Sequence, residues 1–191
     1  MKKIILCLLL TSSLSHAVGI LLDPSLGYLL GNTNELNADR SYNGINLGIK
    51  AAATFEFTPK FFVFGGLDGT YGSTNREAGG GFSEASYDEK NFGLVVGLMT
   101  PFMLRGWATY IFSSDFEDAV GNSYKGNGFR LGVGFTGLPI VSLNLEYQRL
   151  NYDEKQFGAT KTRSALSGSN QLDTSAVVFS VSIPWHIKMK F

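Results

Sequence analysis

Few residues of this 191-residue sequence have the types and spacing that catalysis needs. Its single cysteine is Cys7, and its two histidines are His16 and His186. Cys7 and His16 lie in the first 17 residues, which resemble a removable leader. A common type of nucleophilic site combines a histidine base with a serine or an aspartate. His186 is interpreted instead as an interfacial or interior residue, so we expect no catalytic centre.

Two other motifs could hold an ion or a phosphate. The carboxylates of Asp115, Glu117 and Asp118 are of the type that binds calcium, but their spacing lacks the pattern of a calcium loop. The triplet Gly79–Gly81 does not stand between a strand and a helix, as phosphate binding would require. Both segments are interpreted as solvated loops, and no metal or cofactor is expected.

Charged residues within apolar stretches are more informative. In the segment 45–57 the odd positions, such as Ile45, Leu47 and Ile49, are apolar, whereas Lys50 and Glu56 have the other parity. Side chains alternate between the two faces of a strand, so one face is apolar and the other polar. The polar parity of this and similar stretches carries three positive and three negative residues: Lys50, Glu56, Asp68, Arg105, Arg130 and Glu146.

Eight such stretches follow one another, beginning near residues 20, 42, 61, 91, 104, 124, 140 and 177. In the first, Leu21 and Leu29 fall on the polar parity, and in the fifth Trp107 and Ile111 do, so the facing of these two stretches stays open. The connections alternate between tight turns, as at 58–60, 101–103 and 137–139, and longer polar segments, as at 32–41, 73–90, 113–123 and 153–173. This pattern predicts antiparallel hairpins with both termini on the side of the tight turns.

Strands of this length indicate a membrane. Sheet can cross a bilayer only as a closed barrel, and each crossing takes about 9–11 residues that alternate between apolar and polar. The sequence therefore predicts an all-β fold, an eight-stranded antiparallel up-and-down transmembrane β-barrel. The alternative is a soluble sandwich or lipocalin-like barrel, against which the leader and the long strands count.

The termini complete the domain organisation. Residues 1–17 combine Lys2 and Lys3, an apolar run and the small-residue site ending at Ala17, which predicts a cleaved signal peptide and a barrel domain over 18–191. Lys plus Arg and Asp plus Glu both total 16, so the chain without its two leader lysines is slightly acidic. That balance argues against a nucleic-acid partner.

The last strand alternates up to the final residue, with apolar Trp185, Ile187, Met189 and Phe191 on one parity. With this ending the chain resembles the small eight-stranded outer-membrane barrels of Gram-negative bacteria, the group that includes the OmpA membrane domain and OmpX. The resemblance implies a monomer in the outer membrane, surrounded by its lipids and lipopolysaccharide. It also implies that the barrel assembly machinery reads these four residues as a signal. Pro184 and the basic end of the strand depart from the family pattern.

The six charges are expected to pair inside the barrel, where an unpaired charge is costly. If the second hairpin is centred on Pro59, Lys50 faces Asp68, and if the sixth-to-seventh hairpin is centred on Leu138, Arg130 faces Glu146. An eight-stranded barrel has room only for side chains, which favours a plugged interior over a gate. The sequence therefore predicts a structural or surface-interaction role with an unknown loop ligand; a small gated pore is the first alternative, and a lipid-modifying enzyme is the second.

Overall fold

The computed structural model describes residues 18–35, 38–58, 61–77, 84–119, 121–158, 160, 162–166 and 171–189. The strands in them are β1 (Val18–Glu35), β2 (Ala38–Thr58), β3 (Phe61–Arg76), β4 (Ala85–Met99), β5 (Leu104–Asp118), β6 (Ser123–Phe135), β7 (Ser142–Gln156), β8 (Arg163–Ala165), β9 (Leu172–Ser182) and β10 (Trp185–Lys188). Among these residues no helix is long and apolar enough to cross a membrane. The expected signal peptide over 1–17 lies outside the described residues.

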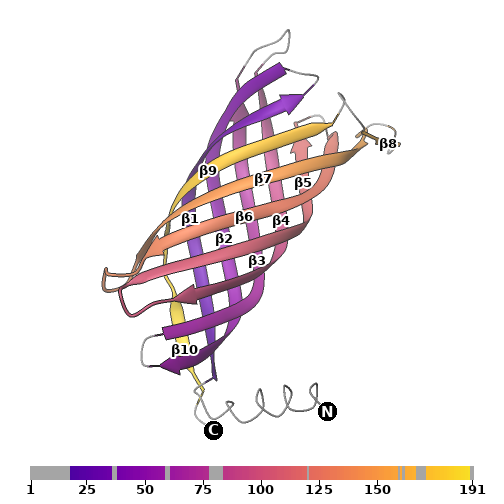
Figure 1. Cartoon of the computed structure of the whole chain (residues 1–191). Coiled ribbons are helices and arrows are strands. Elements are labelled where there is room, and N and C mark those ends of the chain that lie inside the picture. The colour runs from indigo at the N-terminus through magenta and orange to yellow at the C-terminus, as the bar shows by residue number, and fades with distance from the viewer. Residues whose placement is uncertain are drawn as a thin grey trace, which may run out of the picture.

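The strands form a closed antiparallel barrel (Figure 1). Each strand from β1 to β7 pairs with the next, β7 pairs with β9, and β9 pairs with β1. β10 continues the course of β9 along β1, and β8 is a short strand beside the end of β7. In the described residues the ring thus has eight strands, and the predicted up-and-down barrel is confirmed.

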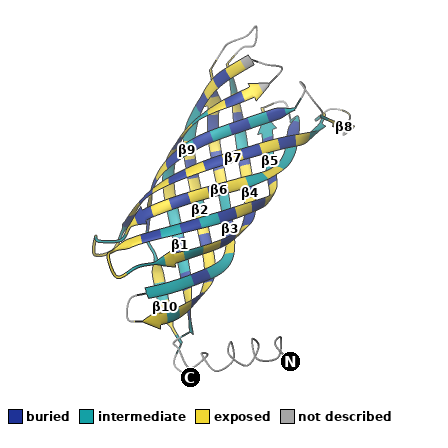
Figure 2. Ribbon diagram, in the orientation of Figure 1, coloured by how far each residue is buried: buried dark blue, intermediate teal, exposed yellow. Residues whose placement is uncertain are grey.

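Burial alternates along most of the long strands of the ring, as Figure 2 shows by colour. On β2 the outward Ile45, Leu47 and Ile49 are 50–57% exposed, whereas the inward Asn46 and Lys50 are at most 6% exposed. A soluble protein would have the reverse arrangement, with apolar side chains inside. The apolar exterior is the surface that a barrel presents to hydrocarbon, and all its backbone groups can pair around the ring.

Exposed aromatic side chains border this apolar belt. At or next to its end on the loop side lie Tyr28, Tyr71, Phe92, Tyr110, Phe112, Phe129 and Tyr147, and at its other end lie Phe55, Phe57, Phe102, Phe135 and Trp185. Rings of this kind favour the boundary between hydrocarbon and headgroups. Beyond the loop-side border the outward residues become polar, beginning with Asn32, Ser73, Lys90 and Arg149.

The structure settles which way β1 and β5 face. Leu21, Leu29, Trp107 and Ile111 are all buried at 5% or less, so the parity that carries them points inward. The interior is therefore mixed, because a narrow barrel must be packed and apolar groups fill space between polar ones.

Several strands run farther than the hydrophobic pattern predicts. The expected connection over 32–41 is mostly strand, since β1 ends at Glu35 and β2 begins at Ala38, and β3 and β4 likewise extend into the segment 73–90. Backbone pairing continues where outward side chains are already polar, so the barrel projects beyond its belt on the loop side.

One seam of the barrel is interrupted, where the first and last strands meet. The ladder between β1 and β9 ends at Ser25 and Ser182, and the ladder between β1 and β10 resumes at Leu22 and Trp185. Pro24 and Pro184 lie in the gap, and neither has a backbone N–H to donate. The Ile183 N–H still donates to the Pro24 carbonyl at 3.0 Å, which keeps the two edges together.

Candidate functional site

Most charged side chains of the interior form two groups, and the buried Arg40 and Arg76 lie outside both, with Arg76 against the Tyr87 ring. The first, here called the Arg105 cluster, contains Arg105, Asp23, Asn144 and Ser182. The Arg105 guanidinium donates to Asp23 Oδ2 at 2.7 Å, to Asn144 Oδ1 at 2.8 Å and to Ser182 Oγ at 2.6 Å. Both charged side chains are only 1% exposed, and they come from opposite walls, β5 and β1. In this cluster Asp23 is thus the single anion paired with Arg105.

The second group, the shared-charge network, contains Lys50, Asp68, Glu89, Arg130, Glu146 and Gln148. Arg130 lies 3.3 Å from Asp68 and 3.6 Å from Glu146, and Lys50 lies 3.5 Å from the same Glu146. Arg130 also donates to Gln148 at 2.6 Å, and Gln148 in turn donates to Glu89 at 2.6 Å. Arg130 and Glu146 therefore each have more than one polar neighbour, in a medium where such contacts reinforce one another.

The register agrees with one predicted pair and corrects the other. Lys50 lies directly opposite Asp68 on β2 and β3, although the ion pair that its ammonium makes is with Glu146 across the barrel. Arg130 lies opposite Gln148, and Glu146 lies opposite Gly132, so the predicted register of β6 and β7 is wrong by two residues. The reason is that the turn is centred on Pro139 rather than Leu138, and the long Arg130 side chain still reaches Glu146 diagonally.

Glu56 and Arg105 were expected in the same set of charges. Arg105 does lie inside, but its ion-pair partner is Asp23, which sequence reasoning did not select. Glu56 lies near the turn-side end of the barrel, where Lys188 donates to it at 3.0 Å. Asp23 shares its parity with the buried Leu21 and Leu29, and that parity was the signal that could have identified it.

Aromatic side chains fill the interior on the loop side of the charges. Phe116, which is fully buried, stacks on Tyr87 with ring centroids 4.5 Å apart and lies 5.8 Å from Tyr152 and 6.4 Å from Tyr42. Tyr152 accepts a hydrogen bond from Ser114 at 3.0 Å. This group, here called the aromatic layer, spans the interior from β2, β4, β5 and β7.

The C-terminal strand presents part of the expected assembly signal. Trp185 and Ile187 point outward and are 55% and 53% exposed, and Met189, half-buried, donates its N–H to the Val18 carbonyl at 3.0 Å. Phe191 lies outside the described residues. Three of the four residues therefore have the outward or edge positions that a recognition element needs, while their role stays a prediction.

Two contacts bear on chemistry. His186 Nε2 lies 2.7 Å from the Thr54 hydroxyl, and its ring meets Phe62 edge to face. The described contacts show no carboxylate hydrogen-bonded to this ring, as a third member of a catalytic triad would be. Among the described residues no three His, Cys, Asp or Glu side chains converge as a metal site would require.

Comparisons with known proteins found similar chains among solved structures only. No family model matches the sequence, and no curated protein matches it. Among solved structures it is similar to Neisserial surface protein A, at 12% identity over 86% of this chain and 97% of that one, with a TM-score of 0.48. It is also similar to Ail, the attachment invasion locus protein of Yersinia pestis, at 14% identity over 87% and 99%, with a TM-score of 0.49. A third is OprG from Pseudomonas aeruginosa, at 11% identity over 92% and 98%, with a TM-score of 0.42. From its own strand order and belt, the chain has the eight-stranded barrel fold of small outer-membrane proteins.

Proposed function

We propose that this protein is a monomeric outer-membrane barrel with a structural or surface-interaction role and no enzymatic activity. The observation that carries the proposal is the filled interior. From the turn side to the loop side the barrel contains the Arg105 cluster, the shared-charge network and the aromatic layer in succession. Because buried ion pairs and stacked rings fill the interior at each of these levels, partners would bind to the outer surface on the loop side. The polar side chains of that surface do not specify one class of partner.

A small gated pore is the second candidate, and one contact favours it. Arg130 lies within 3.6 Å of both Asp68 and Glu146, so a modest rotation could exchange its partners. Opening would also have to displace the aromatic layer, in which Phe116 and Tyr152 are fully buried. An open pore would thus require both a change of partners at Arg130 and displacement of the aromatic layer, which favours the plugged barrel.

Conductance separates these candidates. The folded protein in a planar lipid bilayer should give no discrete current steps across a range of voltages. The variant Phe116→Ala, which thins the aromatic layer, should remain silent as well, because the charge network still fills the interior. Repeated current steps from the wild-type barrel, abolished by unfolding it, would replace the structural role with the pore.

Recognition by the barrel assembly machinery is a separate part of the proposal. Deleting Phe191 should lower the amount of folded barrel in the outer membrane and raise periplasmic degradation, since the terminal aromatic is the proposed recognition element. The matched control is Phe102→Ala, which removes an exposed aromatic ring from the turn between β4 and β5. Equal yields from both variants would show that the signal lies elsewhere.

A further inference from the structure

Glu89 on β4 is a buried carboxylate that forms no ion pair within the described part of the chain. Its side chain is fully buried, and its Oε1 accepts hydrogen bonds from Asn91 and Gln148, both at 2.6 Å. The second carboxylate oxygen, Oε2, has no hydrogen-bond partner among the described residues. A bare carboxylate oxygen away from solvent is costly, so we expect another group to compensate it.

The shared-charge network has an excess of negative charge. Its two cations and three carboxylates are Lys50, Arg130, Asp68, Glu89 and Glu146. Both cations are ion-paired with Asp68 or Glu146, whereas Glu89 meets the neutral amides of Asn91 and Gln148. The network is therefore one positive charge short of balance.

The two other buried arginines near this level do not supply that charge. Arg40 and Arg76 come from the loop-side ends of β2 and β3, and both engage other groups. Arg76 lies against the Tyr87 ring, in the aromatic layer. In the described contacts neither forms an ion pair with Glu89.

Further oxygen atoms surround the Glu89 carboxylate. The hydroxyls of Tyr42 and Tyr152 lie within electrostatic range of it, and both neighbour the Thr174 hydroxyl. All three side chains are at most 2% exposed. The hydroxyls of Tyr42 and Thr174 make no aligned hydrogen bond with a described residue. Four strands, β2, β4, β7 and β9, thus bring oxygens to one enclosed place between the shared-charge network and the aromatic layer.

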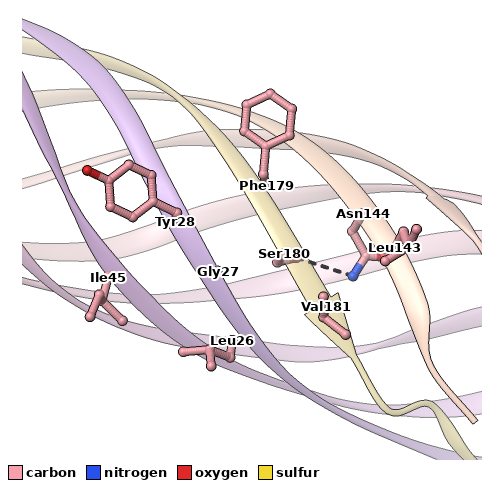
Figure 3. A pocket seen from close by; sticks show the side chains of 9 residues that line it. All are labelled: Leu26, Gly27, Tyr28, Ile45, Leu143, Asn144, Phe179, Ser180 and Val181. Carbon is pink, nitrogen blue, oxygen red and sulfur yellow. Dashed lines mark hydrogen bonds between the residues drawn. The ribbon is translucent and has the colours of Figure 1, made fainter.

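The outer wall has a hollow of a different kind. Figure 3 shows a groove of about 530 Å³ along β1 and β9, lined mainly by apolar side chains such as Leu26 and Phe179. Behind these side chains Asn144 donates to Ser180, as the dashed line marks. This groove offers a charged ligand no counter-charge, whereas the interior place at Glu89 does.

We propose that the barrel interior binds a monovalent cation, of the size of sodium or potassium, between Glu89, Tyr42, Tyr152 and Thr174. The carboxylate supplies the charge, and the hydroxyls supply neutral oxygens, which hard cations prefer as ligands. A single carboxylate suits a monovalent ion better than calcium, and no three acidic or other metal-binding side chains converge among the described residues. A water molecule would satisfy the hydrogen bonds but would leave the excess charge uncompensated in a low-dielectric medium.

The test measures how the unfolding equilibrium responds to cations. The full mature barrel is unfolded by urea in lipid vesicles, while sodium or potassium chloride replaces choline chloride at constant ionic strength. Choline is too large for an enclosed site of this kind. At about a tenfold excess of the bound ion over its dissociation constant, the unfolding equilibrium constant should fall about tenfold, as for any ligand that binds only the folded state. Sodium, potassium or both should give this response.

Glu89→Gln should abolish the cation response, because the amide keeps the shape of the side chain without its charge. The matched control is Glu56→Gln, which changes a carboxylate near the turn-side end of the barrel, where Lys188 donates to it. This control should keep the wild-type response. Heat-modifiable gel mobility checks that each variant is folded before the titration.

Tyr42→Phe tests the site in a variant that keeps every charge. Loss of one hydroxyl ligand should raise the cation concentration for half the response severalfold. Equal unfolding of the wild type in sodium, potassium and choline chloride would overturn the site, and so would a full cation response from Glu89→Gln. A wild-type stability that responds to pH but to neither cation would assign the compensating charge to a proton, which also overturns the site.

Discussion

The Arg105 cluster and the shared-charge network satisfy buried charge in different ways. Arg105 has one anion, Asp23, and neutral hydrogen-bond partners otherwise. Arg130 divides its contacts between two carboxylates, and one of them also serves Lys50. Loss of Asp23 therefore leaves Arg105 without an anion, whereas loss of Asp68 leaves Arg130 with Glu146. We therefore expect the number of opposite charges around each ion, more than its burial, to decide how far a single substitution lowers the free energy of unfolding.

The largest effect is expected from Asp23→Asn. It leaves the Arg105 guanidinium buried with only neutral partners, and removal of one member of a buried pair commonly costs about 3–5 kcal/mol. Urea-induced unfolding in lipid vesicles measures the loss. Adding Arg105→Leu should recover part of it, because no unpaired charge then remains. A loss below about 1 kcal/mol would mean that water reaches this cluster.

The same substitution in the other group, Asp68→Asn, should cost less, about 1–3 kcal/mol. Arg130 keeps Glu146 and Gln148, and Thr109, which donates to Asp68 at 2.9 Å, keeps an amide oxygen as its acceptor. The same unfolding experiment gives the difference between the two variants. If Asp68→Asn proved as costly as Asp23→Asn, sharing of charges would not protect the network.

Double-mutant cycles sharpen the comparison within the network. Lys50 and Glu146, which are in contact across the barrel, should show a coupling free energy of about 1 kcal/mol or more. Lys50 and Asp68 are direct neighbours in the register, yet their coupling should be smaller, because the Lys50 ammonium is directed to Glu146. The reverse order of the two couplings would restore the neighbouring-strand pairing that the sequence predicts.

The smallest effect is expected at the barrel end. Lys188 is 55% exposed and pairs with Glu56, and exposed ion pairs contribute about 0–1 kcal/mol because water and salt screen them. Lys188→Ala should therefore change the unfolding free energy by less than about 1 kcal/mol. The effect should shrink further when the salt concentration is raised. A loss as large as that of Asp68→Asn would show that this end is sealed from water.

The barrel itself could be predicted from sequence because period-two alternation fixes both strand type and facing. Lys50 was correctly predicted to lie opposite Asp68, although a β-bulge between Glu56 and Thr58 shifts the register near the end of β2. The turn after β6 leaves six residues, 136–141, outside the strands, and there the predicted centre was wrong. A hairpin's register is only as certain as the centre of its turn.

The pairing of charges could not be predicted in the same way. Arg105 on β5 reaches Asp23 on β1, and Lys50 on β2 reaches Glu146 on β7. Such contacts cross the barrel between strands that are not neighbours, so a hairpin register says nothing about them. Glu89 was missed because strand pairing continues past the apolar belt, into a segment that hydrophobic alternation assigns to a loop.

The gap at Pro24 and Pro184 divides the closing seam into two units of unequal strength. β9 pairs with β1 from Ser25 to Asn34, whereas β10 pairs with it only from Gly19 to Leu22. The shorter unit can detach without disturbing the longer one, as local openings in proteins follow contiguous cooperative segments. Backbone amides of β10 would then exchange with solvent deuterium well before those of β9. The C-terminal segment of the barrel can therefore open locally while the ladder between β1 and β9 stays intact.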